Sequence, residues 1–218
     1  MSLECLPNRR DFLLKTGAAI ATSVSGLALF PEPASAQDDT HDWTVGPRSG
    51  FTPEIGTLVS MMAFTRRQVL MNVKGLSQQD LDFLLDAKAN TIGALLLHLA
   101  ATETYYSMNT FGGMKWDSWS DDIKKKWDVP MNLGDPARKV IKGNNLDYYL
   151  NALHEAREKT LTELKKRDDK WLLVSEMDEG DRINNYGKWF HVAEHESNHD
   201  GQIKFLKSRV PGAKPSGE

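Results

Sequence analysis

Three histidines near the C-terminus, His191, His195 and His199, have the side chains and the spacing that point most directly to chemistry. Residues four apart lie above one another on one face of an α-helix. At about 100° per residue the three side chains fall within a stripe about 80° wide, which also includes Gln202. Apolar residues flank the stripe, so we expect it to face the interior, where an imidazole needs a hydrogen-bond partner or a cation. The pattern favours a metal site, and the alternative is a row of separately hydrogen-bonded histidines.

Two imidazoles one helical turn apart make half of a metal site, and His98 is the best candidate for the third ligand. His98 lies in an apolar helical run, where a lone histidine is more often only hydrogen-bonded. Its presence in one small protein with the pair of His195 and His199 favours ligation. We therefore predict His98, His195 and His199 as metal ligands, whereas His154 and His41 are expected to be exposed. The ion is a divalent metal, and zinc, nickel, manganese and iron all accept imidazole.

Four polar residues beside the predicted ligands are candidates for supporting roles. Glu196 and Glu194 are the candidate general bases, although they fall about 140° and about 60° from His191 and so lie off the histidine stripe. Glu194 could instead orient a ligand through its second ring nitrogen, and both carboxylates could equally be surface charges. His191 and Gln202 are placed to hydrogen-bond around the metal ligands, with an ordinary core histidine as the alternative for His191.

The run from His195 to His199 also matches the pattern His-Glu-x-x-His of zinc proteases, in which the glutamate acts as general base. Such enzymes usually take a third ligand further along the chain. No histidine follows His199, and Phe205 stands where the extended pattern places its third histidine. The protease interpretation is therefore a minor alternative.

Apolar residues recur at helical spacing in four long stretches, and no repeated strand pattern is present. The expected helices begin near Pro53, Thr91, Asn145 and Asn185. A long connection over about 111–144, with a short polar helix near 120–127, separates the second helix from the third. A linker over about 168–184 contains a short piece, 172–174, that we expect to be extended. The sequence thus predicts an all-α protein, a four-helix bundle whose inward side chains build the metal site.

The N-terminal sequence predicts an export signal. Arg9 and Arg10 are followed by a Phe-Leu pair and a lysine, which resembles a twin-arginine signal, and a mildly apolar stretch then leads to a small-residue cleavage site at 34–36. This stretch is too short and too weakly apolar for a membrane span. We expect a bacterial protein, periplasmic or secreted, without a stable membrane span after cleavage. The alternative is an ordinary helix after a chance arginine pair.

The overall composition is that of a soluble globular protein, with 218 residues, a net charge of −3 and 26% charged residues. The chain has no excess of basic residues, which a nucleic-acid-binding protein would be expected to show. The expected organisation is a signal peptide over 1–36, a leader over 37–51, the bundle over 52–212 and a tail over 213–218. Signal cleavage removes Cys5, the only cysteine, so a metal site of the mature chain must use histidine or carboxylate ligands.

Two motifs resemble the DinB-like family of metal-binding four-helix bundles. The first is GLSQQDLDF at 75–83 with NTIGALLLHLAATE at 90–103, and the second is WFHVAEHESNHDGQI at 189–203. The family carries one histidine ligand on its second helix and two, four apart, on its last helix. By position these are His98, His195 and His199. Asn198 and Asp200 depart from the family's common histidine and arginine, which puts substrate or partner contacts at those positions in doubt.

The resemblance implies a metal-binding protein, and family members include transferases and isomerases that use low-molecular-weight thiols. Three neutral ligands leave a bound ion an open position, which suits catalysis. We expect an exported enzyme that activates water or a thiol for attack on a small electrophile, and hence a hydrolase or a thiol transferase. The partners would be a small substrate and a low-molecular-weight thiol, and a homodimer is allowed. The alternative is a non-catalytic metal-binding bundle, because fold and ligands alone do not fix the reaction.

Overall fold

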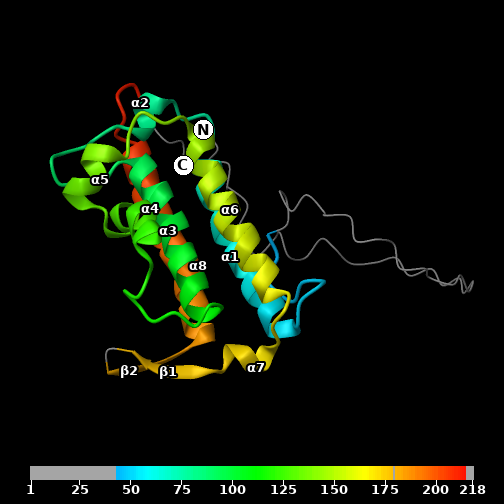
Figure 1. The fold of residues 1–218 in the computed structure, drawn as a ribbon. Helices are drawn as coiled ribbons and strands as arrows, with labels where there is room; N and C mark the ends of the chain where they lie inside the picture. The colour runs from blue at the N-terminus through cyan, green and yellow to red at the C-terminus, as the bar shows by residue number, and fades with distance from the viewer. Residues whose placement is uncertain (1–42, 179, 215–218) are drawn as a thin grey trace, which may run out of the picture. The chain divides into compact units, whose positions relative to one another are not determined.

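A computed structural model describes residues 43–178 and 180–214, which form a bundle of long helices (Figure 1). The four bundle helices are α1 (Pro53–Val73), α3 (Ile92–Thr110), α6 (Leu146–Leu164) and α8 (Asn185–Lys207). They begin within two residues of the predicted positions and confirm the all-α four-helix bundle. The predicted signal over 1–36, residues 37–42 with His41, and the end of the predicted tail lie outside the described residues.

The direction of the helices explains the long connection in the middle of the chain. Helices α1 and α8 run one way along the bundle, and α3 and α6 run the other way (Figure 1). Helix α8 packs against α1 and α3, and α6 packs against α3 and α1. Because α3 and α6 point in the same direction, the chain must return along the whole bundle between them, and bundles of this type need such a crossover.

The crossover contains two helices, α4 (Asp121–Asn132) and α5 (Gly134–Val140). Helix α4 continues beyond the predicted end near residue 127 and packs against α3. The chain bends sharply after it, where Leu133 and Gly134 both have positive φ angles, of 54° and 68°. Glycine adopts such angles without strain, which fits its place at this corner. The crossover therefore covers α3 on the side that the other bundle helices leave open.

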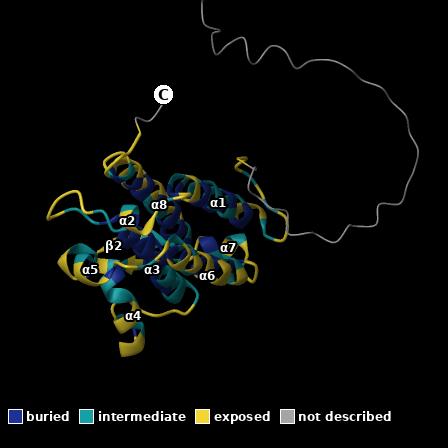
Figure 2. Cartoon of the chain, turned by 90° about the horizontal axis from the view of Figure 1, so that it is seen from above, coloured by how far each residue is buried: buried dark blue, intermediate teal, exposed yellow. Residues whose placement is uncertain are grey.

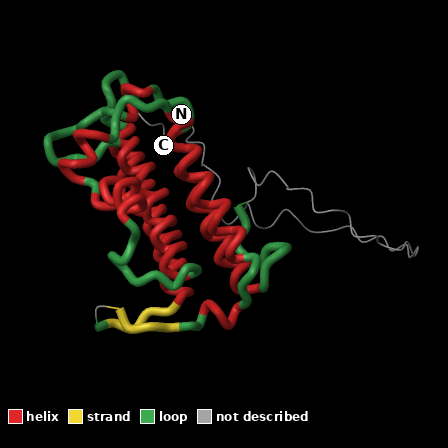
Figure 3. Tube along the Cα trace, viewed as in Figure 1, coloured by secondary structure: helices red, strands yellow, loops and turns green. Residues whose placement is uncertain are grey.

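A short helix and a hairpin join α6 to α8 at the other end of the bundle (Figure 3). They are α7 (Asp169–Leu172), β1 (Ser175–Asp178) and β2 (Asp181–Asn184), and the strands pair antiparallel with Ser175 opposite Asn184. The prediction of an extended piece at 172–174 was wrong. Asp168 accepts a hydrogen bond from the Trp171 amide and caps α7, so the buried Leu172 ends a helical turn and the strand starts only at Ser175.

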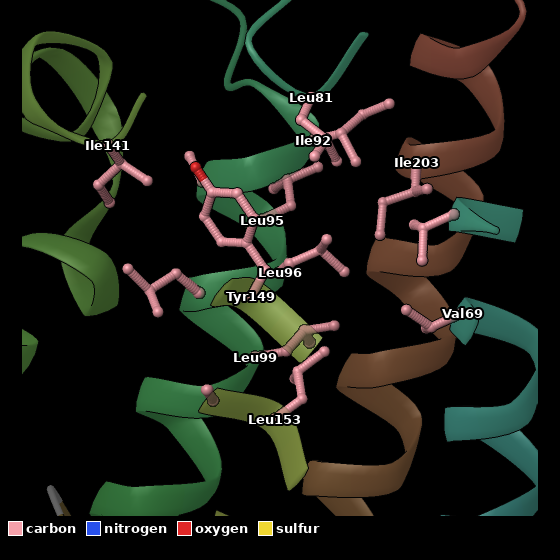
Figure 4. Close-up of a cluster of buried hydrophobic side chains, with 14 of the residues drawn as sticks. Val69, Leu81, Ile92, Leu95, Leu96, Leu99, Ile141, Tyr149, Leu153 and Ile203 are labelled. Carbon is pink, nitrogen blue, oxygen red and sulfur yellow. The ribbon is translucent and has the colours of Figure 1, made fainter. Parts of the chain in front are cut away.

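The core lies between the bundle helices, where the buried residues gather in the view along the bundle (Figure 2). Helix α3 is buried on nearly all sides, as its apolar sequence predicted, because α4, α6 and α8 surround it. Its leucines meet side chains from other helices, and the close-up labels Val69, Leu95, Leu96, Tyr149 and Ile203 among them (Figure 4). This packing holds α3 beside α8, the two helices that carry the predicted metal ligands.

The described end of the predicted leader packs against α1. The Trp43 ring meets the Phe64 ring edge-on, with centroids 5.0 Å apart, and the Gly46 amide donates to the Ser60 hydroxyl at 2.9 Å. A Cβ atom on Gly56 would lie 2.4 Å from the Arg48 backbone nitrogen, so this contact needs glycine. Among the described residues, no helix has the length and apolar character needed to cross a membrane.

Candidate metal centre

Three imidazoles converge between α3 and α8. The Nε2 atom of His195 lies 2.8 Å from Nε2 of His98 and 3.1 Å from Nε2 of His199. Four ligands at about 2.05 Å around a tetrahedral zinc ion lie about 3.3 Å apart, so the observed spacing is within about half an ångström of that arrangement. One nitrogen from each of the three residues lies within 4.8 Å of the others. The structure thus brings together the three residues that the sequence predicted as ligands.

The positions at which α3 and α8 begin determine where the three histidine side chains lie. The Thr91 hydroxyl accepts from the Ala94 amide at the start of α3, and the Asn184 side chain accepts from the Gly187 amide at the start of α8. Such caps satisfy amides that have no partner within the helix and fix where the helix begins. Because α3 and α8 run antiparallel and pack together, His98 meets the His195–His199 pair from the opposite side.

The outer ring nitrogens are already hydrogen-bonded, which directs the inner ones to the centre. Nδ1 of His98 donates to the Pro130 carbonyl at 3.1 Å, and Nδ1 of His199 donates to Oε1 of Gln202 at 3.1 Å. In a neutral imidazole the other nitrogen then carries only a lone pair. At most one proton, on Nε2 of His195, remains for three converging nitrogens, and it can serve only one neighbour. A divalent cation would satisfy all three at once, so these residues fit a metal ion.

The three imidazoles are neutral near pH 7. Burial, followed by the neighbouring His199, lowers the pKa of His98 to about 4. Burial, followed by His199 and His98, lowers the pKa of His195 to about 3, and burial also lowers the pKa of His199. Because a metal binds only the deprotonated ring, these lowered pKa values reduce the competition of protons for this site at neutral pH.

His191 and Glu194 form an exposed pair at the edge of the cluster. Nδ1 of His191 lies 3.2 Å from a Glu194 carboxylate oxygen, and the two side chains are 44% and 46% exposed. The His191 ring centroid lies 5.1 Å from that of His195 and 5.7 Å from that of Tyr106. His191 is therefore beside the three-nitrogen cluster and does not belong to it. His154 is exposed on α6, as expected.

Glu196, the other candidate general base, has a different environment. Its side chain is 2% exposed and points into the bundle, where Oε1 accepts from Nε of Arg66. Its Oε2 atom accepts from Arg157 Nη2 and from the Thr65 hydroxyl, both at 3.2 Å. Both carboxylate oxygens of Glu196 therefore accept hydrogen bonds from guanidinium groups inside the bundle and do not face the three imidazoles. This placement argues against Glu196 as the general base, in the metal-dependent enzyme and in the zinc-protease interpretation alike.

Arg66, Glu103, Arg157 and Glu196 form a closed set of buried ion pairs that we call the charge ring. Arg66 Nη2 lies 2.9 Å from one Glu103 oxygen, and Arg157 Nε lies 2.7 Å from the other. Burial raises the pKa of Glu103, but Arg157 and Arg66 together outweigh it and hold that pKa below its usual value. Sequence reasoning missed this ring and also the Pro130 carbonyl. In the sequence, the charge ring could have been inferred only from charged residues that lie on otherwise apolar helix faces.

Three histidines from two antiparallel helices, inside an all-α bundle with a long central crossover, define a DinB-like metal-binding protein. The model of the Mycothiol-S-transferase family matches residues 57–212, which span all four bundle helices and all three histidines. The chain belongs to this family, which is itself DinB-like. No curated protein matches the chain.

Proposed function

We propose that the protein is a metal-dependent thiol transferase, which joins a low-molecular-weight thiol to a small electrophile. The observation that carries this proposal is the convergence of His98, His195 and His199 in a chain whose family is named for transfer of mycothiol. In the proposed reaction the thiol loses its proton to a base and its sulfur forms a bond to an electrophilic carbon. The bond from that carbon to its leaving group breaks, and the leaving group departs into solution with the bonding electrons.

The donor set suits an open site. All three ligands are neutral imidazoles, and no carboxylate or thiolate among the described residues joins the cluster, so a bound divalent ion keeps its full charge. Such an ion would act as a Lewis acid that favours the ionised form of a thiol or a water molecule. Pro130 and Gln202 accept hydrogen bonds from the outer nitrogens of His98 and His199. These bonds fix the orientation of the two imidazole rings before a metal ion binds.

We propose that the pair of Glu194 and His191 receives the proton that the thiol releases. The pair lies at the solvent-exposed edge of the cluster, one helical turn from His195. The Glu194 carboxylate lies 3.2 Å from Nδ1 of His191, and both side chains are partly exposed to solvent, so the pair can take up a proton and pass it to solution. Glu196 has no such freedom, because guanidinium groups hold both of its oxygens.

A cavity of about 540 Å³ provides room for the body of a substrate, within the usual size range of small-molecule sites. Leu95 and Gln202 line it, and each is three residues from a predicted ligand, His98 or His199. The cavity therefore lies about one helical turn along α3 and α8 from the histidine cluster. Gln202 links the two, because it lines the cavity and accepts from His199.

We also propose that residues 1–36 are a twin-arginine signal and that the protein is exported to the periplasm or beyond the cell, because Arg9 and Arg10 are followed by a mildly apolar stretch and a small-residue cleavage site. This route carries folded proteins, so the metal site would be filled before export. Replacing Arg9 and Arg10 with lysine should keep the protein in the cytoplasm, as measured by cell fractionation. Normal export of that variant would contradict the assignment.

The test of the metal site compares four single variants by elemental analysis. His98→Ala, His195→Ala and His199→Ala should lose most of the bound metal, whereas His154→Ala, on the exposed face of α6, should keep it. Equal occupancy in all four variants would overturn the proposal.

The test of the reaction uses the metal-loaded protein, a small alkylating electrophile and a panel of thiols that includes mycothiol. Consumption of the electrophile that depends on the thiol supports a transferase. Thiol-independent consumption would instead identify a hydrolase. Stoichiometric metal without turnover of any pair would favour a non-catalytic binding protein.

A further inference from the structure

The charge ring takes one residue from each of the four bundle helices. Arg66 lies on α1, Glu103 on α3, Arg157 on α6 and Glu196 on α8. The pairs Arg66–Glu196 and Arg157–Glu103 join helices that pack side by side. The pairs Arg66–Glu103 and Arg157–Glu196 join helices that lie opposite each other in the bundle. The ring therefore links every helix of the bundle to two others.

The ring is closed, and every nitrogen and oxygen of its charged groups has a hydrogen-bond partner. Each of its four carboxylate oxygens accepts from a guanidinium group. The Nη1 atom of each arginine donates to the backbone, from Arg66 to the Leu153 carbonyl and from Arg157 to the Met62 carbonyl, both at 3.0 Å. Its two positive and two negative charges cancel. Removing four charges from water is costly, and apolar side chains often stabilise a fold equally well, so stability alone does not account for the ring.

The ring also borders the metal centre. Glu196 directly follows His195 on α8, and Glu103 is five residues after His98 on α3. Arg66, Glu103, Glu196 and His195 line one small gap between the helices. The two ring carboxylates thus fix the two helices that carry the ligands, within about one turn of those ligands.

Small rotations of a helix matter at this distance. The Cα atoms lie about 2.3 Å from the helix axis, and an imidazole Nε2 lies about 7 Å from it. A rotation of α8 by about 10° would therefore move that nitrogen by about 1.2 Å. Metal–ligand distances tolerate only about 0.2 Å, whereas an apolar core loses rigidity and a unique arrangement before it loses stability.

We propose that the charge ring is a positioning device for the metal centre, which sets the rotation of α3 and α8 so that His98 and His195 converge. This inference rests on the proposed function, because it requires that the histidine cluster binds a metal. The ring residues touch neither metal nor substrate, and they act through the helices that hold the ligands.

The test titrates metal-free protein with Co²⁺, whose visible spectrum reports the geometry of its ligands, and measures affinity against a competing chelator. Glu196→Gln should weaken Co²⁺ binding by about 10- to 100-fold and change the spectrum. The matched control is Leu172→Ala, which removes a buried side chain on α7, outside the bundle helices. It should lower the melting temperature but leave both the affinity and the spectrum unchanged.

Arg66→Lys is the second variant if Glu196→Gln does not fold. Its single ammonium group keeps the charge but cannot bridge Glu103 and Glu196 and also reach the Leu153 carbonyl, so the same weakening is expected. Wild-type affinity and spectrum in a folded ring variant would overturn the positioning role while the metal site stands. A wild-type protein that binds no Co²⁺, or His195→Ala with unchanged affinity, would instead overturn the proposed function.

Discussion

Glu103→Gln should strongly destabilise the metal-free protein. The Glu103 side chain is fully buried and accepts from Arg66 and Arg157 at 2.9 and 2.7 Å. The amide that replaces it has almost the same shape but no charge, so two buried guanidinium groups would share the single carboxylate of Glu196. Breaking a buried ion pair from one side costs about 3–5 kcal/mol, because a charge is left uncompensated. For a domain of this size the loss corresponds to a drop of about 6–20 °C in melting temperature.

The assay is urea and thermal unfolding followed by far-ultraviolet circular dichroism, with a chelator present so that metal binding does not contribute. Glu155→Gln is the matched control, because it makes the same chemical change at an exposed position on α6 and should alter stability by less than about 0.5 kcal/mol. A loss below about 1 kcal/mol for Glu103→Gln would refute the description of the ring as a balanced buried network.

A variant with all four ring residues made apolar separates stability from positioning. Replacing Arg66 and Arg157 with methionine, and Glu103 and Glu196 with leucine, leaves no unpaired charge, so stability should return to near the wild-type value. Metal affinity should stay low, because apolar contacts do not fix the helix rotation. Recovery of both properties would show that packing alone positions the histidines.

Three further predictions concern the histidines. Lowering the pH from 7 to 5 should destabilise the metal-free protein. His98 has a pKa of about 4 in the folded protein and about 6.5 in the unfolded chain, so the unfolded chain binds more protons in this pH range. The contribution of His98 lowers the free energy of unfolding by about 2 kcal/mol at pH 5. Urea unfolding of wild type and His98→Gln at both pH values checks this, and an equal pH effect in the two proteins would contradict it. Gln202→Leu keeps the size of the side chain but removes the acceptor for His199, and it should weaken metal binding about tenfold in a chelator competition, with Gln78→Leu as an exposed control on α2 (Gln78–Leu81). Zinc at about 100 times its dissociation constant should stabilise the wild type by about 2.7 kcal/mol, and an unchanged melting temperature would count against binding to the folded state.

The contrasting environments of Glu194 and Glu196 show that helical spacing alone does not predict which side chains of a helix are buried. The angles about α8 placed both carboxylates off the histidine stripe, and they could not distinguish a surface charge from a buried one. Glu194 is exposed beside His191, whereas Glu196 is buried among residues of α1, α3 and α6. The difference depends on which helix packs over each face of α8, and the residues that decide it lie between 39 and 130 positions away in the chain.

Local spacing was enough to predict the four helices and the pairing of His195 with His199, because neighbours three and four residues apart set helical structure directly. The tertiary structure decided how His98 approaches that pair, since its position depends on α3 running antiparallel to α8. It also supplied the Pro130 carbonyl from the crossover and closed the charge ring with one residue from each helix. These contacts join parts of the chain that are remote in sequence, and only the packing of whole helices against one another brings them within hydrogen-bonding distance.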